Sequence, residues 1–213
     1  MKDGTDESSD IMRSAVEGDS SAQGLLFAKY RDRLRRMIRL RMDRRMQGRL
    51  DASDVLQDAY LEFSRSLPDY AADPTMPFYL WLRTLTGRKL HALHRKHLGA
   101  EMRDAGREVC LHRVSAPETN SGSLAELLMG RMTSPSQVIM REELQLKIQA
   151  ALDRMDEIDR EVLALRHFEH LSNAETARVL SVTEKAASIR FVRALKRFKD
   201  VLADVPGLFE EAI

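Results

Sequence analysis

Residues 171–202, in the last third of the chain, carry the pattern of two short helices separated by a tight turn. Ser172 followed three residues later by Glu175 is a capping box, which predicts where the first helix begins. Ser181 and Val182 form the turn, and Thr183 can cap a second helix. The spacing predicts a helix-turn-helix unit, with an unrelated helical hairpin as the alternative.

The second of these helices has an apolar side and a cationic side. Its apolar stripe keeps the helical period and comprises Ala187, Phe191, Ala194, Leu195, Phe198 and Leu202. The other side carries Lys185, Arg190, Arg193, Lys196 and Arg197. A cationic second helix is typical of helix-turn-helix proteins that place this helix in the major groove of DNA.

The composition favours an all-α protein. Aromatic residues make up 6% of the 213 residues, glycine and proline are sparse, and Leu, Ala, Arg, Glu and Met dominate. A single cysteine, Cys110, excludes an internal disulfide and suits a reducing compartment. No apolar run approaches the roughly 20 residues that span a bilayer, and the acidic N-terminus is unlike a secretion signal. We therefore expect a cytoplasmic protein without membrane contact.

The formal net charge of +1 conceals a strong segregation of charge along the chain. Three segments, Lys29–Arg49, Arg83–His97 and Lys185–Lys199, hold 21 of the 34 lysines and arginines. The acidic residues concentrate elsewhere, for example between Asp51 and Glu62. Such segregation indicates a protein that meets polyanions with some faces and other partners with the rest.

Phe78–His97 combines three aromatic residues, including the only tryptophan, with five Lys or Arg, three His and no acidic residue. Wound as a helix, it places its apolar residues on one arc and a row of donors on the next, namely Thr84, Arg88, His91 and Arg95. Aromatic faces beside cations suit unstacked bases and their phosphates. A surface helix with a solvated basic side is the simpler alternative.

The segment before it predicts a helix with an acidic outer face. Asp51 or Ser53 can cap this helix, and Asp54 complements its dipole. The buried stripe is Leu56, Tyr60, Phe63 and Leu67, and the outward row is Asp54, Gln57, Asp58 and Leu61. Pro68 is expected to end the helix. The following loop, residues 69–77, either lines a pocket for one base or is simply a turn.

The pattern predicts two helical domains joined by a flexible linker. Residues 1–10 are expected to be disordered and residues 11–99 to form the first domain. Residues 100–136, rich in Pro, Ser, Gly and Thr around the short patch LAELL, form the linker. The second domain covers residues 137–204 and a tail covers residues 205–213.

Taken together, these segments resemble the bacterial RNA polymerase sigma factors of the sigma-70 family, in particular the small extracytoplasmic-function (ECF) type. LDASDVLQDAYLEF, from Leu50, resembles the polymerase-binding helix of region 2, FYLWLRTLTGRKL its promoter-melting segment and HALHRKH its reader of the −10 element. Residues 152–202 resemble region 4, which reads the −35 element. Ser181 stands where the family usually has a turn glycine, in a left-handed position.

The resemblance implies a sigma factor that binds core RNA polymerase, through the clamp helices of the large subunit and the flap, and starts transcription at specific promoters. It implies core-polymerase contacts at Asp51, Asp54, Val55, Gln57 and Asp58. It implies −10 contacts at Tyr79, Trp81, Arg83, Arg88, Lys89, His91, His94 and Arg95. It implies −35 contacts at Thr183, Glu184, Lys185, Ser188, Arg190, Arg193 and Arg197. An anti-sigma factor is a further partner of such proteins.

Other functions fit the sequence less well. A stand-alone helix-turn-helix regulator that binds DNA as a dimer is the main alternative. His91, His94 and His97 recur every three residues, but arginine and lysine surround them and no carboxylate completes a metal site. A nuclease using Asp51, Asp54 and Asp58 lacks any supporting motif. We therefore expect no enzyme activity, no metal and no cofactor, with promoter melting driven by binding energy.

Overall fold

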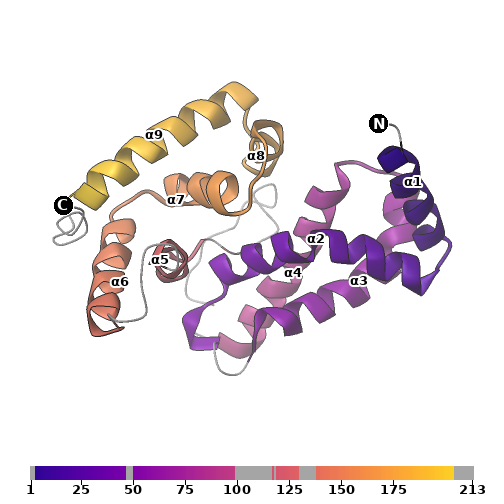
Figure 1. Ribbon diagram of the computed structural model, residues 1–213, viewed down its shortest axis with the longest axis horizontal. Coiled ribbons are helices and arrows are strands. Elements are labelled where there is room, and N and C mark those ends of the chain that lie inside the picture. The colour runs from indigo at the N-terminus through magenta and orange to yellow at the C-terminus, as the bar shows by residue number, and fades with distance from the viewer. Residues whose placement is uncertain (1–2, 47–49, 99–116, 118, 130–137, 204–213) are drawn as a thin grey trace.

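The computed structural model describes residues 3–46, 50–98, 117, 119–129 and 138–203, and within these ranges the secondary structure is entirely helical (Figure 1). The helices are α1 (Asp3–Val16), α2 (Ser20–Arg41), α3 (Ala52–Ala72), α4 (Phe78–Leu98), α5 (Ser121–Met129), α6 (Val138–Asp153), α7 (Glu157–Leu163), α8 (Asn173–Val179) and α9 (Glu184–Ala203). Short turns lie at η1 (Arg44–Met46) and η3 (Ala164–Phe168). The all-α prediction is confirmed.

Helices α1 to α4 pack together and form what we call the first half of the chain. Their core is lined by fully buried aliphatic residues such as Leu34, Ile38 and Leu82. Aromatic rings fill one end of it: Phe63 lies 5.5 Å from Phe27 and 6.1 Å from Trp81, measured between ring centroids. Edge and tilted contacts of this kind add to the apolar burial that holds α3 against α4.

Helix α3 does not end at Pro68, as the sequence predicted, but continues to Ala72 with the proline inside it. Contacts from the last turn offset the hydrogen bond that proline cannot donate. Tyr70 donates from its hydroxyl to the carbonyl of Met76 at 2.8 Å. Its ring stacks on Trp81, with centroids 4.5 Å apart. The expected loop is therefore shortened to residues 73–77.

Helices α5 to α9 form what we call the second half. The helix-turn-helix prediction is confirmed in its details. Ser172 accepts from the backbone of Glu175 at 3.1 Å, and the Glu175 carboxylate accepts from the backbone of Ser172 at 2.8 Å. Thr183 accepts from the backbone of Ala186 and so caps α9. Ser181 has a φ of 53°, which is the left-handed conformation expected at the turn position where the family usually has glycine.

Two segments near the expected boundaries are helical in the structure. Helix α1 begins at Asp3, so residues 3–10 are helical where disorder was expected. Helix α5 lies within the predicted linker, and its Leu124 and Ala125 are buried. The apolar LAELL patch explains this burial, because α5 packs on α6 and on α2. The backbone N–H of Asn120, just before α5, donates to the carbonyl of Leu40 at 2.8 Å.

No helix in the part of the chain that the structure describes is long and apolar enough to cross a bilayer.

Replacing Ser172 with alanine is expected to destabilise the helix-turn-helix by about 1 kcal/mol, because the backbone N–H of Glu175 at the start of α8 loses the hydroxyl that accepts its hydrogen bond. For a chain of this size that corresponds to a fall in melting temperature of roughly 2–4 °C. Thermal unfolding followed by far-UV circular dichroism measures it. Ser188→Ala, inside α9, is the control and should not lower the melting temperature, because alanine is the better helix former.

Candidate nucleic-acid interface

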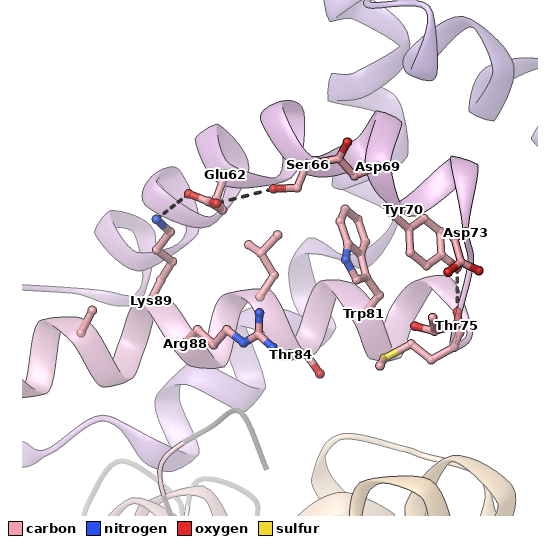
Figure 2. Close-up of a pocket in the computed structure, with 13 residues that line it drawn as sticks. Glu62, Ser66, Asp69, Tyr70, Asp73, Thr75, Trp81, Thr84, Arg88 and Lys89 are labelled. Atoms are coloured by element: carbon pink, nitrogen blue, oxygen red, sulfur yellow. Dashed lines mark hydrogen bonds and ion pairs between the residues drawn. The ribbon is translucent and has the colours of Figure 1, made fainter. Parts of the chain in front are cut away.

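A pocket of about 510 Å³ opens between α3 and α4 (Figure 2). It is lined by Glu62, Ser66, Asp69, Tyr70, Asp73, Thr75, Met76, Trp81, Thr84, Leu85, Arg88, Lys89 and Ala92. Figure 2 shows the rings of Tyr70 and Trp81 side by side at one end, with Lys89 and Glu62 at the other. The size falls within the usual range for small planar ligands. An aromatic wall of this kind offers a surface on which a base can stack.

Charged side chains of both signs line the pocket. Lys89 donates to Glu62 at 2.7 Å, and this hydrogen bond holds the pKa of the Glu62 carboxyl below its usual value. Arg88 is exposed and lines the same wall. Asp69 and Asp73 lie toward the aromatic end and present acceptors. The pocket can therefore hold a phosphate near its cations and accept hydrogen bonds from base amino groups near its carboxylates.

Three residues predicted to contact the −10 element are buried in this conformation. Tyr79 stacks on Tyr30 at 5.7 Å and lies under the guanidinium of Arg33, and burial raises its pKa to about 12. Burial also lowers the pKa of His94. Arg83 is paired inside the protein, as described below. Tyr79, Arg83 and His94 are 4%, 2% and 5% exposed, so little of each reaches solvent.

The remaining residues predicted for the −10 element are more accessible. Arg88 and Arg95 are exposed, and Lys89, His91 and Trp81 are half-buried. Trp81 lines the pocket while its other contacts belong to the aromatic core. The helical period of α4 thus separates a cationic row at the surface from the core, as the sequence predicted, but it does not assign Arg83 to the correct side.

The acidic face of α3 is divided between structural and exposed residues. Asp51 and Asp54 form a reciprocal capping box, with the Asp54 carboxylate accepting from the Asp51 backbone at 2.7 Å. Val55 is fully buried in the core. Gln57 and Asp58 are exposed, and Leu61 on the same row is 50% exposed. Of the five residues predicted to contact polymerase, only Gln57 and Asp58 are exposed and take no part in the capping box.

Helix α9 displays most of its predicted DNA-contacting residues. Glu184, Lys185 and Arg193 are exposed, and Ser188 and Arg190 are half-buried. Thr183 is exposed but serves as the cap of the helix. Arg197 is tied to Asp156 at 3.1 Å and to Asp159, and these contacts raise its pKa. Leu195, expected in the apolar stripe, is 40% exposed.

No pattern in the sequence indicated a cluster of four charged residues, of which Arg41, Arg83 and Glu169 are buried and Glu161 is 15% exposed. We call these four residues the interhalf ion cluster. Arg83 donates to Glu169 through Nε at 2.7 Å and through a terminal nitrogen at 3.2 Å. Arg41 contacts Glu169 at 2.5 Å and also pairs with Glu161. Thr119 donates to Glu161 at 2.5 Å. Although burial alone would raise it, the two arginines hold the pKa of Glu169 below its usual value.

Within the described residues, no group of three or more His, Cys, Asp or Glu side chains is placed to hold a metal ion. Of the three histidines spaced three residues apart, His94 is buried, His91 is half-buried and His97 is exposed. Cys110 lies outside the described residues.

Comparisons with known proteins find similarity to sigma factors over most of the chain. The family model described as "Sigma-70, region 4" matches residues 145–198, which include α7, η3 and α8 and all but the end of α9. The ECF RNA polymerase sigma factor SigD of Mycobacterium tuberculosis is 27% identical over 190 residues, covering 89% of this chain and 81% of SigD. The RNA polymerase sigma-H factor of Pseudomonas aeruginosa is 25% identical over 184 residues, covering 86% of this chain and 88% of that protein.

The RNA polymerase sigma factor CnrH of Cupriavidus metallidurans is 25% identical over 194 residues, covering 90% of this chain and 92% of CnrH. The solved structure of CnrH in complex with the cytosolic domain of CnrY matches with a TM-score of 0.53 and 21% identity, covering 91% of this chain and 96% of that chain. The sequence matches run through both halves, and the region 4 match coincides with the helix-turn-helix of α8 and α9.

Proposed function

Because the chain belongs to the ECF type of the sigma-70 family, we propose that it binds core RNA polymerase and directs initiation at promoters with its own −10 and −35 elements. The observation that carries the proposal is the similarity to sigma factors over both halves of the chain. A stand-alone helix-turn-helix regulator would share only the second half. Binding energy, with no ATP or metal, drives promoter opening, so the protein acts as a non-catalytic factor.

In the first half, the pocket between α3 and α4 receives a base that is flipped out of the −10 duplex. Tyr70 and Trp81 supply the stacking surface, which offsets the few kcal/mol that unstacking costs. Arg88, Lys89, His91 and Arg95 follow the strand beside the pocket along the exposed row of α4. The buried Tyr79, Arg83 and His94 act indirectly in this conformation, by positioning α4.

In the second half, the start of α9 enters the major groove at the −35 element. Thr183, Glu184, Lys185 and Ser188 lie where side chains reach base edges, and Arg190, Arg193 and Arg197 lie where they reach phosphates. The exposure of Lys185 and Arg193 supports this arrangement. Arg197 must exchange Asp156 and Asp159 for a phosphate to take part.

The partners follow from the same surfaces. Gln57, Asp58 and Leu61 form an exposed row on α3 that docks on the clamp helices, with Asp51 and Asp54 fixing the start of that helix. Helix-turn-helix residues also meet the flap. A regulatory protein of the anti-sigma kind is a further partner, since the similar CnrH forms a complex with the cytosolic domain of CnrY.

We also propose that the functional division follows the sequence, with residues 11–99 as region 2 and residues 137–204 as region 4. The region 4 match at 145–198 supports the second boundary. Helix α5 lies between the two regions.

Run-off transcription with purified core polymerase and promoter fragments tests the function. We expect transcripts only when both the chain and the core enzyme are present. Tight and specific binding to an operator in the absence of polymerase, with no transcripts in its presence, would favour the stand-alone regulator instead.

Replacing Arg88 with alanine is expected to weaken binding of single-stranded −10 DNA to the holoenzyme by roughly 3- to 10-fold, and to lower the slope of log affinity against log salt by about 0.7. The reason is the loss of one exposed cation at the pocket wall. Fluorescence anisotropy at several salt concentrations measures both effects. Arg65→Ala, an exposed arginine on α3 that does not line the pocket, is the control and should change neither.

A further inference from the structure

The interhalf ion cluster joins parts of the chain that function at different promoter elements. Arg41 lies on α2 and Arg83 on α4, whereas Glu161 lies on α7 and Glu169 directly follows η3. The side chains of Arg41 and Glu169 are 0% exposed and that of Arg83 is 3% exposed. The Glu161 side chain is 15% exposed, so three of the four charges are buried between the halves and the fourth lies at the edge of the cluster, with two positive and two negative charges in balance.

Buried charges are stable only when every member of the set is paired. Taking an ion out of water costs several kcal/mol, and the pairing in a low-dielectric interior must offset that cost. Removing one carboxylate leaves an uncompensated positive charge inside. The unpaired charge regains water when the two halves separate, a movement that also exposes the part of the apolar core that the halves share. The cluster thus stabilises the arrangement in which the two halves are in contact, which we call the closed arrangement, rather than the fold of either half.

Two smaller contacts bridge the halves at the same place. Arg33 of α2 lies 3.9 Å from Glu175, which belongs to the capping box of α8. The backbone of Asn120 donates to the carbonyl of Leu40, one residue before Arg41. The closed arrangement therefore holds the helix-turn-helix directly against the helices of the first half.

This arrangement cannot read both promoter elements on straight DNA. By their positions the −10 and −35 elements lie about 25 base pairs apart, or roughly 85 Å at about 3.4 Å per base pair. Glu169 touches Arg83 in α4 and precedes Glu184, the first residue of α9, by 15 residues. Even a fully extended chain of that length spans at most about 50 Å. The halves must move apart before both elements are engaged.

We propose that the interhalf ion cluster is an internal latch, which keeps the free chain closed and unable to engage both elements until core polymerase pulls the halves apart. The consequence for promoters rests on the proposed function, but the closed state itself does not. Arg83 is central to it, because it sits in the segment assigned to promoter melting and is held by a carboxylate next to the helix-turn-helix.

The test measures the distance between the halves in the free, full-length chain. Spin labels are placed at Arg65→Cys on α3 and Asp200→Cys on α9, both exposed positions, in a Cys110→Ser background. The parent chain should give one narrow distance distribution. Glu169→Gln should shift the ratio of closed to open chains by on the order of 100-fold, seen as a broad population at longer distance. Glu62→Gln, which breaks an ion pair within the first half, is the matched control and should leave the distribution unchanged.

A rescue variant separates opening from misfolding. Arg83→Met combined with Glu169→Leu removes one cation and one anion and leaves the Arg41–Glu161 pair in place. We expect this double variant to be closed, since apolar replacement of a buried pair is tolerated, whereas Glu169→Leu alone opens. Far-UV circular dichroism should show unchanged helical content in all of them. A parent chain that is already open, or a Glu169→Gln chain with the parent's distances, would overturn the latch while leaving the sigma-factor function untouched.

Discussion

Replacing Gln57 and Asp58 together with arginine is expected to abolish assembly with core RNA polymerase. Both side chains are exposed on α3 and neither takes part in the capping box, so the helix itself should persist. On the proposed docking face, the new cations meet the arginines of the clamp helices. Like charges brought together at an interface cost several kcal/mol, so we expect an affinity loss of at least about 100-fold. Co-elution on size-exclusion chromatography and run-off transcription measure it.

The choice of these two residues comes from the structure. Asp54 also belongs to the predicted face, but replacing it removes a cap and would lower stability by about 1 kcal/mol whatever its role in binding. Asp32→Arg, an exposed acid reversed on α2, is the control for charge alone. Retained co-elution of the doubly substituted chain, with the control also binding, would show that polymerase uses a different surface.

Local signals in the sequence were sufficient for most of the helices. The capping boxes at Asp51 and Ser172 are formed by residues three positions apart, so they can be recognised without tertiary information. The left-handed conformation of Ser181 was expected from the resemblance, because the family usually has a turn glycine at this position. The course of α3 past Pro68 could not be predicted, because the contacts that hold its last turn come from Trp81 and Met76 across the pocket.

The functional surfaces were predicted only in part. The helical periodicity of a sequence does not show which basic side chains form ion pairs with carboxylates elsewhere in the protein. Arg83 and Arg88 read alike as cations on one basic helix, yet one is sealed inside the protein and the other is exposed. The difference lies in Glu169, a residue 86 positions from Arg83. A carboxylate that distant leaves no local signal. Even so, Glu161 adjoins the buried Val162 and Glu169 adjoins the buried Phe168, which is an unusual setting for an unpaired acid.

Reversing Arg193 to glutamate is expected to weaken recognition of the −35 element by roughly 10- to 100-fold. Arg193 is exposed on α9, where we place a phosphate contact, and the reversal replaces an attraction with a repulsion. The loss should be uniform across −35 sequences, because a phosphate contact carries no base information. Losing one contact should also reduce the slope of log affinity against log salt by about 0.9. Holoenzyme binding to promoter duplexes at several salt concentrations measures both quantities.

Lys199→Glu is the matched control, because it makes the same charge change on the same helix but lies near its C-terminal end, away from the groove. We expect it to reduce affinity by much less than Arg193→Glu does. A second comparison uses a promoter fragment from which the −35 element has been removed, on which the parent and Arg193→Glu chains should bind alike. If Arg193→Glu instead weakened both fragments equally, the residue would act on polymerase or on the first half, and the placement of α9 in the −35 groove would be wrong.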